Sequence, residues 1–445
     1  MRFFKNRLGH GFSERFQRLS KEGFLVGLGQ AMALAGSIVG VRMLTELLTP
    51  AAYGELALGI TLAMLVNQTI LGPLSSGVMR FYAPACEAGD LGGYLKAVFR
   101  LVSSATGLIS LITLLTILGL WVAGYAQWIG IAVAALFFAV VSGYNSILDG
   151  IQNAGRQRSV VAFHQGMSAW LRFLVAAGLL MVLGATSTVA MVGYAISVVL
   201  VIGSQYVFFR RFIPRDLPGK DIKRNWQADI YGYSWPISTW GIFTWAQLSS
   251  DRWALGIFAS TQEVGLYTVL FQLGYYPMML ATGMGVQFVA PIFYQQAGDA
   301  SDSRRNAQVS RLSSVLILLA LGLTGLGVVV ALVFHTQIFR LLVSREYGAI
   351  SHLLPWMLFA GGITAASQVC ALNLMSQMKT RAMAVAKITT AVLGVLFNIA
   401  GAYAYGITGI VVAGVLFSVL SFFWMMVLLR KVSKIQAPDL KGQQI

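Results

Sequence analysis

Arginine side chains stand inside or at the ends of otherwise apolar stretches of this chain, where a charge requires an explanation. Arg42 and Arg252 lie at the ends of two such stretches, 210 residues apart, and Asp251 precedes Arg252. Arg80 ends another apolar stretch, and Arg172 lies within one. An ionisable residue inside a membrane span is costly and marks a functional path by default. Because cations outnumber acids in these stretches, we expect an anionic substrate rather than a cationic one.

Polar residues also fall on single faces of two expected helices. Gln165, Ser168 and Arg172 lie at helical spacing, and at an offset of 222 residues they correspond to Lys387, Thr390 and Gly394, a stripe that continues through Asn398 and Gly401. One interpretation is a pair of cationic cavity walls. The alternative is interior packing, with the glycines allowing close helix approach and Lys387 reaching the membrane surface.

Three further stripes contain hydrogen-bonding and aromatic groups suited to sugar rings. They are Trp240, Thr244, Gln247 and Asp251; Gln272, Tyr276, Met279 and Gly283; and Thr61, Gln68 and Ser75. Tryptophan and tyrosine near helix ends also serve as interfacial anchors without touching a substrate. From these stripes we retain Trp240, Gln247, Asp251, Gln272, Tyr276 and Gln68 as candidate substrate-binding residues.

The composition indicates a polytopic membrane protein, because 57% of residues are hydrophobic and only 11% are charged, against about a quarter in soluble domains. The formal charge is +16, but the basic residues do not form a stripe on a soluble surface, so we expect no nucleic-acid partner. Cys86 and Cys370 both fall in apolar surroundings, and we expect neither a metal site nor a redox role for them.

Twelve apolar runs are long enough to cross about 30 Å of hydrocarbon. They lie near 23–43, 55–83, 97–121, 127–149, 160–183, 187–209, 230–250, 264–293, 309–334, 353–376, 383–404 and 407–429. All but five of the 32 Lys and Arg residues fall in the two terminal segments and the alternate loops. By the positive-inside rule those segments, and both termini, are cytoplasmic.

The expected domains follow from these spans. Residues 1–22 form a basic amphipathic cytoplasmic segment, 23–209 an N-terminal lobe, 210–228 a cytoplasmic linker, 229–429 a C-terminal lobe and 430–445 a cytoplasmic tail. A disordered basic tail is the alternative for the first segment.

Internal repetition supports two lobes of six helices. Phe81-x-Ala83-Pro84 recurs as Phe288-x-Ala290-Pro291, and the turns near 155 and 184 recur near 378 and 406, at offsets drifting from 207 to 223. Because six is an even number, the two repeats have the same orientation in the membrane. The fold class is therefore all-α and polytopic, with two parallel six-helix lobes and a substrate path between them.

No phosphate-binding GxxxxGK[ST] motif is present, and the outer side carries only scattered acids, so we expect neither an enzyme nor a cofactor. Coupling to H⁺ or Na⁺ stays open. The enzyme alternative, a glycan polymerase or ligase, would have to rely on the loop residues His335, Arg340, Arg345 and His352.

The motif Arg42-x-Leu44-x-x-Leu47-Leu48-x-Pro50-x-x-Tyr53-Gly54, with Gly77-x-x-Arg80-Phe81, Asp251-Arg252 and Val264-Gly265-Leu266-Tyr267, resembles the polysaccharide-transporter family of Wzx-type flippases in the MOP superfamily. The resemblance spans nearly the whole chain. It implies two lobes around a central cavity that move polyprenyl-diphosphate-linked oligosaccharide from the inner to the outer leaflet of the bacterial cytoplasmic (inner) membrane.

The same resemblance implies a lipid-linked oligosaccharide and membrane lipid as partners, together with a glycan polymerase and glycosyltransferases of the same pathway. Arg42, Arg80 and Arg252 inherit a role from the family's motif, whereas Arg172 and Lys387 are proposed from the stripes alone. We hypothesise that Arg42 and Arg252 hold the diphosphate in the outward-facing state and that Arg80 helps in the inward-facing state. The main alternative is a cation-coupled exporter of the multidrug-and-toxin-extrusion type.

Overall fold

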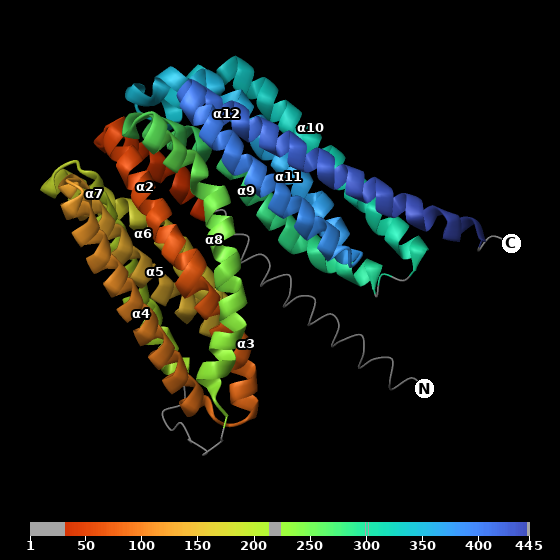
Figure 1. The fold of residues 1–445 in the computed structure, drawn as a ribbon, viewed down its shortest axis with the longest axis horizontal. Coiled ribbons are helices and arrows are strands. Elements are labelled where there is room, and N and C mark those ends of the chain that lie inside the picture. Colours follow the sequence, from red (N-terminus) through yellow and green to blue (C-terminus); the bar gives the residue numbers. More distant parts are fainter. Residues whose placement is uncertain (1–31, 213–223, 299, 301, 443–445) are drawn as a thin grey trace. The chain divides into compact units, whose positions relative to one another are not determined.

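The computed structural model describes residues 32–212, 224–298, 300 and 302–442, and every regular element in these ranges is helical (Figure 1). Long apolar runs become helices because a helix satisfies its backbone hydrogen bonds within itself, as a lipid environment requires. The predicted amphipathic segment 1–22 lies outside the described residues, as do 213–223 of the predicted linker.

Contacts divide the chain into two compact units. Unit 1 comprises residues up to Leu47 and Gly59–Trp245, and unit 2 comprises Leu48–Leu58 and Ala246–Ile445. Two helices are therefore shared between the units, α2 (Pro50–Val66) and α8 (Trp226–Phe258).

Unit 1 contains a helix over 32–47, the π-helix η1 (Asn67–Leu71), α3 (Gly72–Glu87), α4 (Leu91–Val122), the short η2 (Ala126–Trp128), α5 (Ile129–Ala154), α6 (Arg158–Leu183) and α7 (Ser187–Phe212). Unit 2 contains α9 (Thr261–Ala297), α10 (Ser303–Leu342), η3 (Arg345–Leu353), α11 (Leu354–Ser376) and α12 (Thr380–Gly442). Helix α5 packs on α3 and α7, and α11 packs on α9, α10 and α12.

This division differs from the predicted lobe boundary at residues 210–228. The start of α2 groups with unit 2 because its backbone touches that of α9: a Cβ atom on Gly54 would overlap the carbonyl oxygen of Thr261, and one on Gly265 would overlap that of Pro50. The predicted lobes describe a repeat in the sequence and remain a prediction, whereas the compact units describe contacts.

The described residues agree with the twelve predicted spans. Nine helical segments are long and apolar enough to cross a membrane. One of them, Val385–Lys431, contains two helices, because the backbone breaks at Tyr405 and at Gly406, where φ is +55°. The remaining two predicted spans, the first and the seventh, correspond to the helix over 32–47 and to α8.

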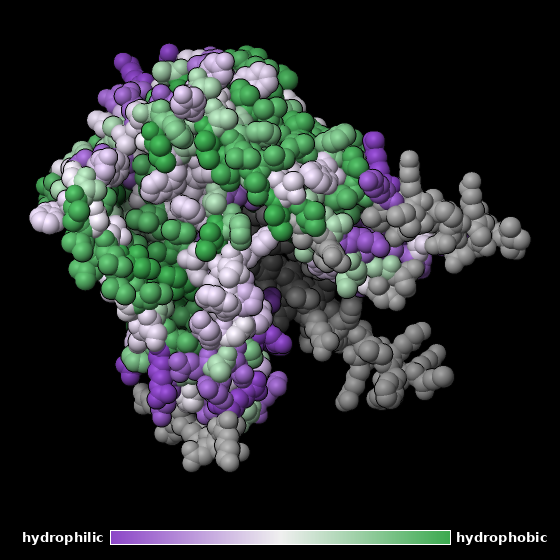
Figure 2. All heavy atoms as spheres, in the orientation of Figure 1, coloured by the Kyte–Doolittle hydropathy of each residue, from purple (hydrophilic) through white to green (hydrophobic). Residues whose placement is uncertain are grey.

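Large apolar side chains cover the broad sides of the helices, and hydrophilic residues gather toward helix ends (Figure 2). On α4, Leu111, Leu114 and Leu118 are all more than half exposed, and on α10 Leu318 and Leu323 are more exposed still. Exposed leucines on this scale are typical of helix faces that contact lipid.

The duplication predicted from the sequence recurs in the backbone conformation. Gly89 and Gly298 both have positive φ, 209 residues apart. Arg156 and Met378 do so 222 residues apart, as do Gly184 and Gly406. The two halves therefore turn at equivalent points, and an offset of 222 holds from α5 to α7.

Asp90 shows how one polar residue positions two helices of unit 1. It is 4% exposed, and its Oδ1 accepts the backbone N–H of Gly93 at 3.0 Å as the N-cap of α4. Its Oδ2 accepts the indole N–H of Trp226, at the start of α8, at 2.8 Å. The carboxylate thus fixes the beginnings of α4 and α8 together.

We expect the Asp90→Ala variant to lose about 2–3 kcal/mol of unfolding free energy, since the cap contributes about 1 kcal/mol and an unpaired buried indole costs about 1–3 kcal/mol. Thermal unfolding of the purified protein in detergent measures the loss. The control is Asp302→Ala, because Asp302 is exposed and caps α10 through backbone N–H groups alone. Equal losses in the two variants would contradict a role for the Trp226 bond.

Candidate functional site

Unit 2 contains an open pocket with about 610 Å³ of empty space, lined by residues of α8, α9, α11 and α12. Its polar lining includes Gln247 and Asp251 from α8 and Asn398 from α12, and its aromatic lining includes Phe271 and Tyr275 from α9. Two stripes predicted separately from the sequence, one on span seven and one on span eleven, therefore meet in one pocket.

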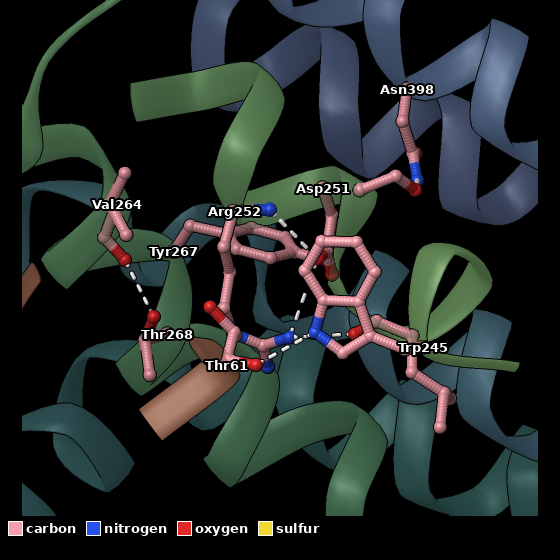
Figure 3. A network of polar contacts seen from close by, with 10 residues as sticks. Thr61, Trp245, Asp251, Arg252, Val264, Tyr267, Thr268 and Asn398 are labelled. Carbon is pink, nitrogen blue, oxygen red and sulfur yellow. Dashed lines mark hydrogen bonds and ion pairs between the residues drawn. The ribbon is translucent and has the colours of Figure 1, made fainter. Parts of the chain in front are cut away.

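Asp251 is the centre of the polar network (Figure 3). It is 7% exposed, and its Oδ2 accepts the hydroxyl of Tyr267 at 2.7 Å. Nη1 of Arg252 lies 3.3 Å from Oδ1 and donates to the carbonyl of Leu248 at 3.0 Å. A carboxylate and a guanidinium next to each other in a buried span neutralise one another, so neither is a lone charge in the membrane.

Aromatic rings enclose the guanidinium of Arg252. Its carbon lies 4.6 Å from the centre of the Phe271 ring and 6.0 Å from that of Tyr267. We did not predict Phe271 or Tyr275 as site residues. Their spacing would have indicated them, because Tyr267, Phe271 and Tyr275 are four residues apart and so share one face of α9.

Asn398 joins α12 to the same region. Its Nδ2 donates to Oγ of Ser250 at 2.9 Å, next to Asp251 in the chain. Gly394, one turn earlier, also lines the pocket. The stripe that begins at Lys387 thus reaches the pocket, while Lys387 itself is half-buried and does not line it.

Several predicted site residues lie elsewhere in their units. Gln272 accepts the hydroxyl of Tyr53 at 2.8 Å, which ties α9 to the start of α2. Gln68 lies in η1, where its carbonyl oxygen adjoins Gly241 of α8. Tyr276 and Trp240 are exposed by 40% and 48% and do not line the pocket.

The arginines of the family motif have dissimilar surroundings. Arg42 forms an ion pair with Glu46, one turn further along its helix, and both side chains are exposed by more than a third. Arg80 is exposed on α3. Only Arg252 is held in a buried network, so these three arginines do not form a symmetrical set of contacts within their units.

Arg172 and Lys387 differ from the motif arginines because no carboxylate lies within ion-pair distance of either among the described residues. Arg172 is half-buried on α6, its Nε is buried without a hydrogen-bond partner, and its guanidinium lies 5.7 Å from the ring centre of Tyr194. Each is thus a cation in a membrane helix without a neutralising acid, which favours an anionic ligand.

No protein-family model matches the chain, and no curated protein matches it. Solved structures share its fold. An inward-facing multidrug resistance MATE family transporter of the MOP superfamily has a TM-score of 0.66 at 14% identity, covering 93% of this chain and 96% of that one. Lipid II flippase MurJ in an inward closed conformation has a TM-score of 0.69 at 11% identity, covering 94% and 90%.

A MATE transporter of Vibrio cholerae, VcmN, is a third relative by structure, with a TM-score of 0.56 at 15% identity and coverage of 95% and 98%. Identities this low show the fold alone. The chain is a multi-pass membrane protein with the all-helical fold of MOP superfamily transporters and flippases.

Proposed function

We propose that this protein is a flippase that moves polyprenyl-diphosphate-linked oligosaccharide from the inner to the outer leaflet of the bacterial cytoplasmic membrane by alternating access, with both termini in the cytoplasm. The observation that carries the proposal is the presence of Arg172 and Lys387 on membrane helices without an acid partner. A diphosphate supplies the negative charge that these residues lack.

The chemistry of the two cations suits phosphate. A guanidinium can pair with two phosphate oxygens at once, and an ammonium acts as a mobile point charge on a flexible stem. One base stands on α6 and the other on α12, the equivalent helices of the two sequence repeats. The hydrophobic tail of such a substrate would stay in the bilayer while the head group passes between the lobes.

The fold is also compatible with a multidrug exporter, and one feature favours that second function. Asp251 faces a pocket with Phe271 and Tyr275, and an acid beside aromatic rings suits an organic cation. In unit 2, however, Arg252 already neutralises this acid. Among the candidate residues, unpaired charge in the described spans is therefore basic at Arg172 and Lys387, which favours the anionic substrate.

Loss of both cations is expected to block export. Each charge-assisted hydrogen bond to phosphate contributes about 1.5–3 kcal/mol, so the variant Arg172→Ala/Lys387→Ala should bind the head group roughly a hundredfold more weakly or worse. Surface glycan should fall, and the lipid-linked oligosaccharide should accumulate on the cytoplasmic leaflet, as in a deletion strain.

The matched control is Arg304→Ala, an exposed base at the start of α10. Normal export by the double variant, at equal membrane abundance, would refute the proposed role of the two cations. Drug efflux that persists in a strain lacking every glycan-assembly gene would favour the exporter instead. Neighbouring genes for glycosyltransferases and a polymerase would support the proposed pathway partners.

A further inference from the structure

A second polar cluster lies inside unit 1, where α5, α6 and α7 meet. Its members are Asp149 and Gln152 of α5, His164 and Gln165 of α6, and Ser204 and Gln205 of α7. None of these residues except Gln165 belongs to a stripe predicted from the sequence, and the proposed binding of a diphosphate makes no use of them.

The carboxylate of Asp149 is held by amides. Its Oδ1 accepts from Nε2 of Gln205 at 2.6 Å, and its Oδ2 accepts from Nε2 of Gln165 at 3.4 Å. The same Nε2 of Gln205 donates to Oε1 of Gln152, also at 2.6 Å. Asp149 is half-buried and Gln165 is exposed, so the carboxylate lies close to the surface of unit 1.

Asp149 has no ion-pair partner among the described residues. Arg156 and Arg158, the nearest bases along the chain, are exposed. From α6 the ionisable neighbour is His164, from α7 the neighbour is the neutral Gln205, and from α3 Ser75 and Met79 pack on the adjacent Gly150. An acid inside a membrane helix therefore stands without a fixed positive charge, an arrangement that is costly unless something neutralises it.

Two polar atoms in the cluster have no partner. Nε2 of Gln152 and Oε1 of Gln205 are buried without a hydrogen bond, and both residues are 0% exposed. Unsatisfied buried groups of this kind call for an ion, a water or a functional role. The position shared by Asp149, Gln152 and Gln205 thus has unused donor and acceptor capacity beside an unneutralised acid.

The sister repeat shows that the fold does not require polarity here. At the offset of 222, Gln152, His164 and Ser204 correspond to Leu374, Ala386 and Met426. These three counterparts belong to a single hydrophobic core cluster of unit 2. Asp149 and Gln205 correspond to Ala371 and Val427, which are also apolar. The same place in the same fold is therefore stable when it is apolar, and the polar cluster of unit 1 needs a different explanation.

We propose that the Asp149 cluster is a binding site for one exchangeable monovalent cation, either a proton on the carboxyl group or a Na⁺ ion held by its oxygens. On protonation, one oxygen of Asp149 gains an O–H bond and its negative charge is removed. Gln205 accepts this O–H after its amide turns over, which exchanges the places of its oxygen and nitrogen. For Na⁺, the carboxylate oxygens and the amide oxygens of Gln152 and Gln205 are the ligands, because hard cations prefer oxygen.

His164 can take part in the same exchange. Its Nδ1 lies 2.8 Å from the carbonyl oxygen of Val160 and therefore donates to it, while Nε2 lies 3.2 Å from Oγ of Ser204. Since a hydroxyl both donates and accepts, Nε2 can gain a proton when that bond reverses. The site does not depend on the proposed flippase function, because cation binding is measured without the transported substrate.

Infrared difference spectroscopy on the purified full-length protein tests the proposal in two arms. One arm compares acidic with alkaline buffer at constant Na⁺, and the other compares NaCl with choline chloride at constant pH. The variants are Asp149→Asn and the control Asp229→Asn, whose carboxylate pairs with Arg224 at the surface. A third variant, Asp149→Ala/Gln152→Leu/His164→Ala/Gln205→Val, converts the cluster to its counterparts in the sister repeat.

We expect a carboxyl band that responds to pH or to Na⁺ in the wild type and in Asp229→Asn, and that is lost in Asp149→Asn and in the fourfold variant. A band that responds only to pH identifies the proton, and one that NaCl also changes identifies Na⁺ as an occupant. If Asp149→Asn fails to fold, the fourfold variant decides. Wild-type responses in both arms after loss of Asp149 would overturn the proposal.

Discussion

Replacing Gly54 by alanine is expected to produce the largest loss of stability and of export among single substitutions of this chain. The Cβ atom of an alanine would overlap the carbonyl oxygen of Thr261, and its other near neighbours are backbone atoms of Thr261 and Gly265. Backbone atoms inside two packed helices cannot turn aside as a side chain can. Overpacking costs typically about 1–3 kcal/mol, and we expect the upper end here or more.

Gly265→Ala should have a similar effect, because its Cβ atom would overlap the carbonyl oxygen of Pro50. Since both substitutions separate the same pair of helix starts, the double variant should lose less than the sum of the two losses. Thermal unfolding in detergent measures stability, and surface-glycan assays measure export. The control is Gly203→Ala, since nothing lies within 4 Å of a Cβ atom there. Indistinguishable behaviour of Gly54→Ala and Gly203→Ala would contradict the backbone contact.

Replacing Arg252 by alanine is expected to give the second largest effect. The side chains of Arg252 and Asp251 are 11% and 10% exposed, so removal of the guanidinium leaves a buried carboxylate with the hydroxyl of Tyr267 as its remaining side-chain donor. Removing one partner of a buried pair costs about 3–5 kcal/mol, and the loss of the packing on Phe271 adds to it. Denaturant unfolding of the purified protein measures the change.

The double variant Arg252→Ala/Asp251→Asn should recover part of this loss, because no uncompensated charge remains. The control is Arg224→Ala, whose ion pair with Asp229 is 43% and 37% exposed and should contribute at most about 1 kcal/mol. If the double variant were no more stable than Arg252→Ala, the pair would not be the reason for the loss. Export by the double variant then separates a substrate-binding role of Arg252 from a structural one.

The hypothesis that Arg42 and Arg252 act as equivalent arginines has to allow for their different surroundings. Arg42 pairs with Glu46 on a partly exposed helix face, whereas Arg252 is enclosed by Asp251 and two aromatic rings. An arginine that already has an acid partner must give it up or share it to bind a phosphate. Arg172 and Lys387 have no such partner, and we therefore place them first among the candidate residues.

The sequence by itself determined the membrane class, the number of spans and the duplication. These properties depend on local hydropathy, on loop composition and on turns, all of which can be recognised in short stretches of chain. The positive φ of Gly89 and Gly298 falls where the repeated Ala-Gly-Asp turn predicted equivalent bends. The stripes on spans seven and eleven were also recognisable, because helical spacing decides which residues share a face.

Only the tertiary structure decided what each face meets. It placed Phe271 over Arg252 and brought Asp251 and Asn398 to one pocket, whereas Trp240 and Tyr276 remained outside it. Motif glycines Gly54 and Gly265, recognised as two copies of one turn, proved to be in contact with each other's helix starts. It also assembled the Asp149 cluster from three helices. Helical periodicity gives the direction of a side chain but not its partner, and the partner decides whether a charge in the membrane is neutralised or left to bind a ligand.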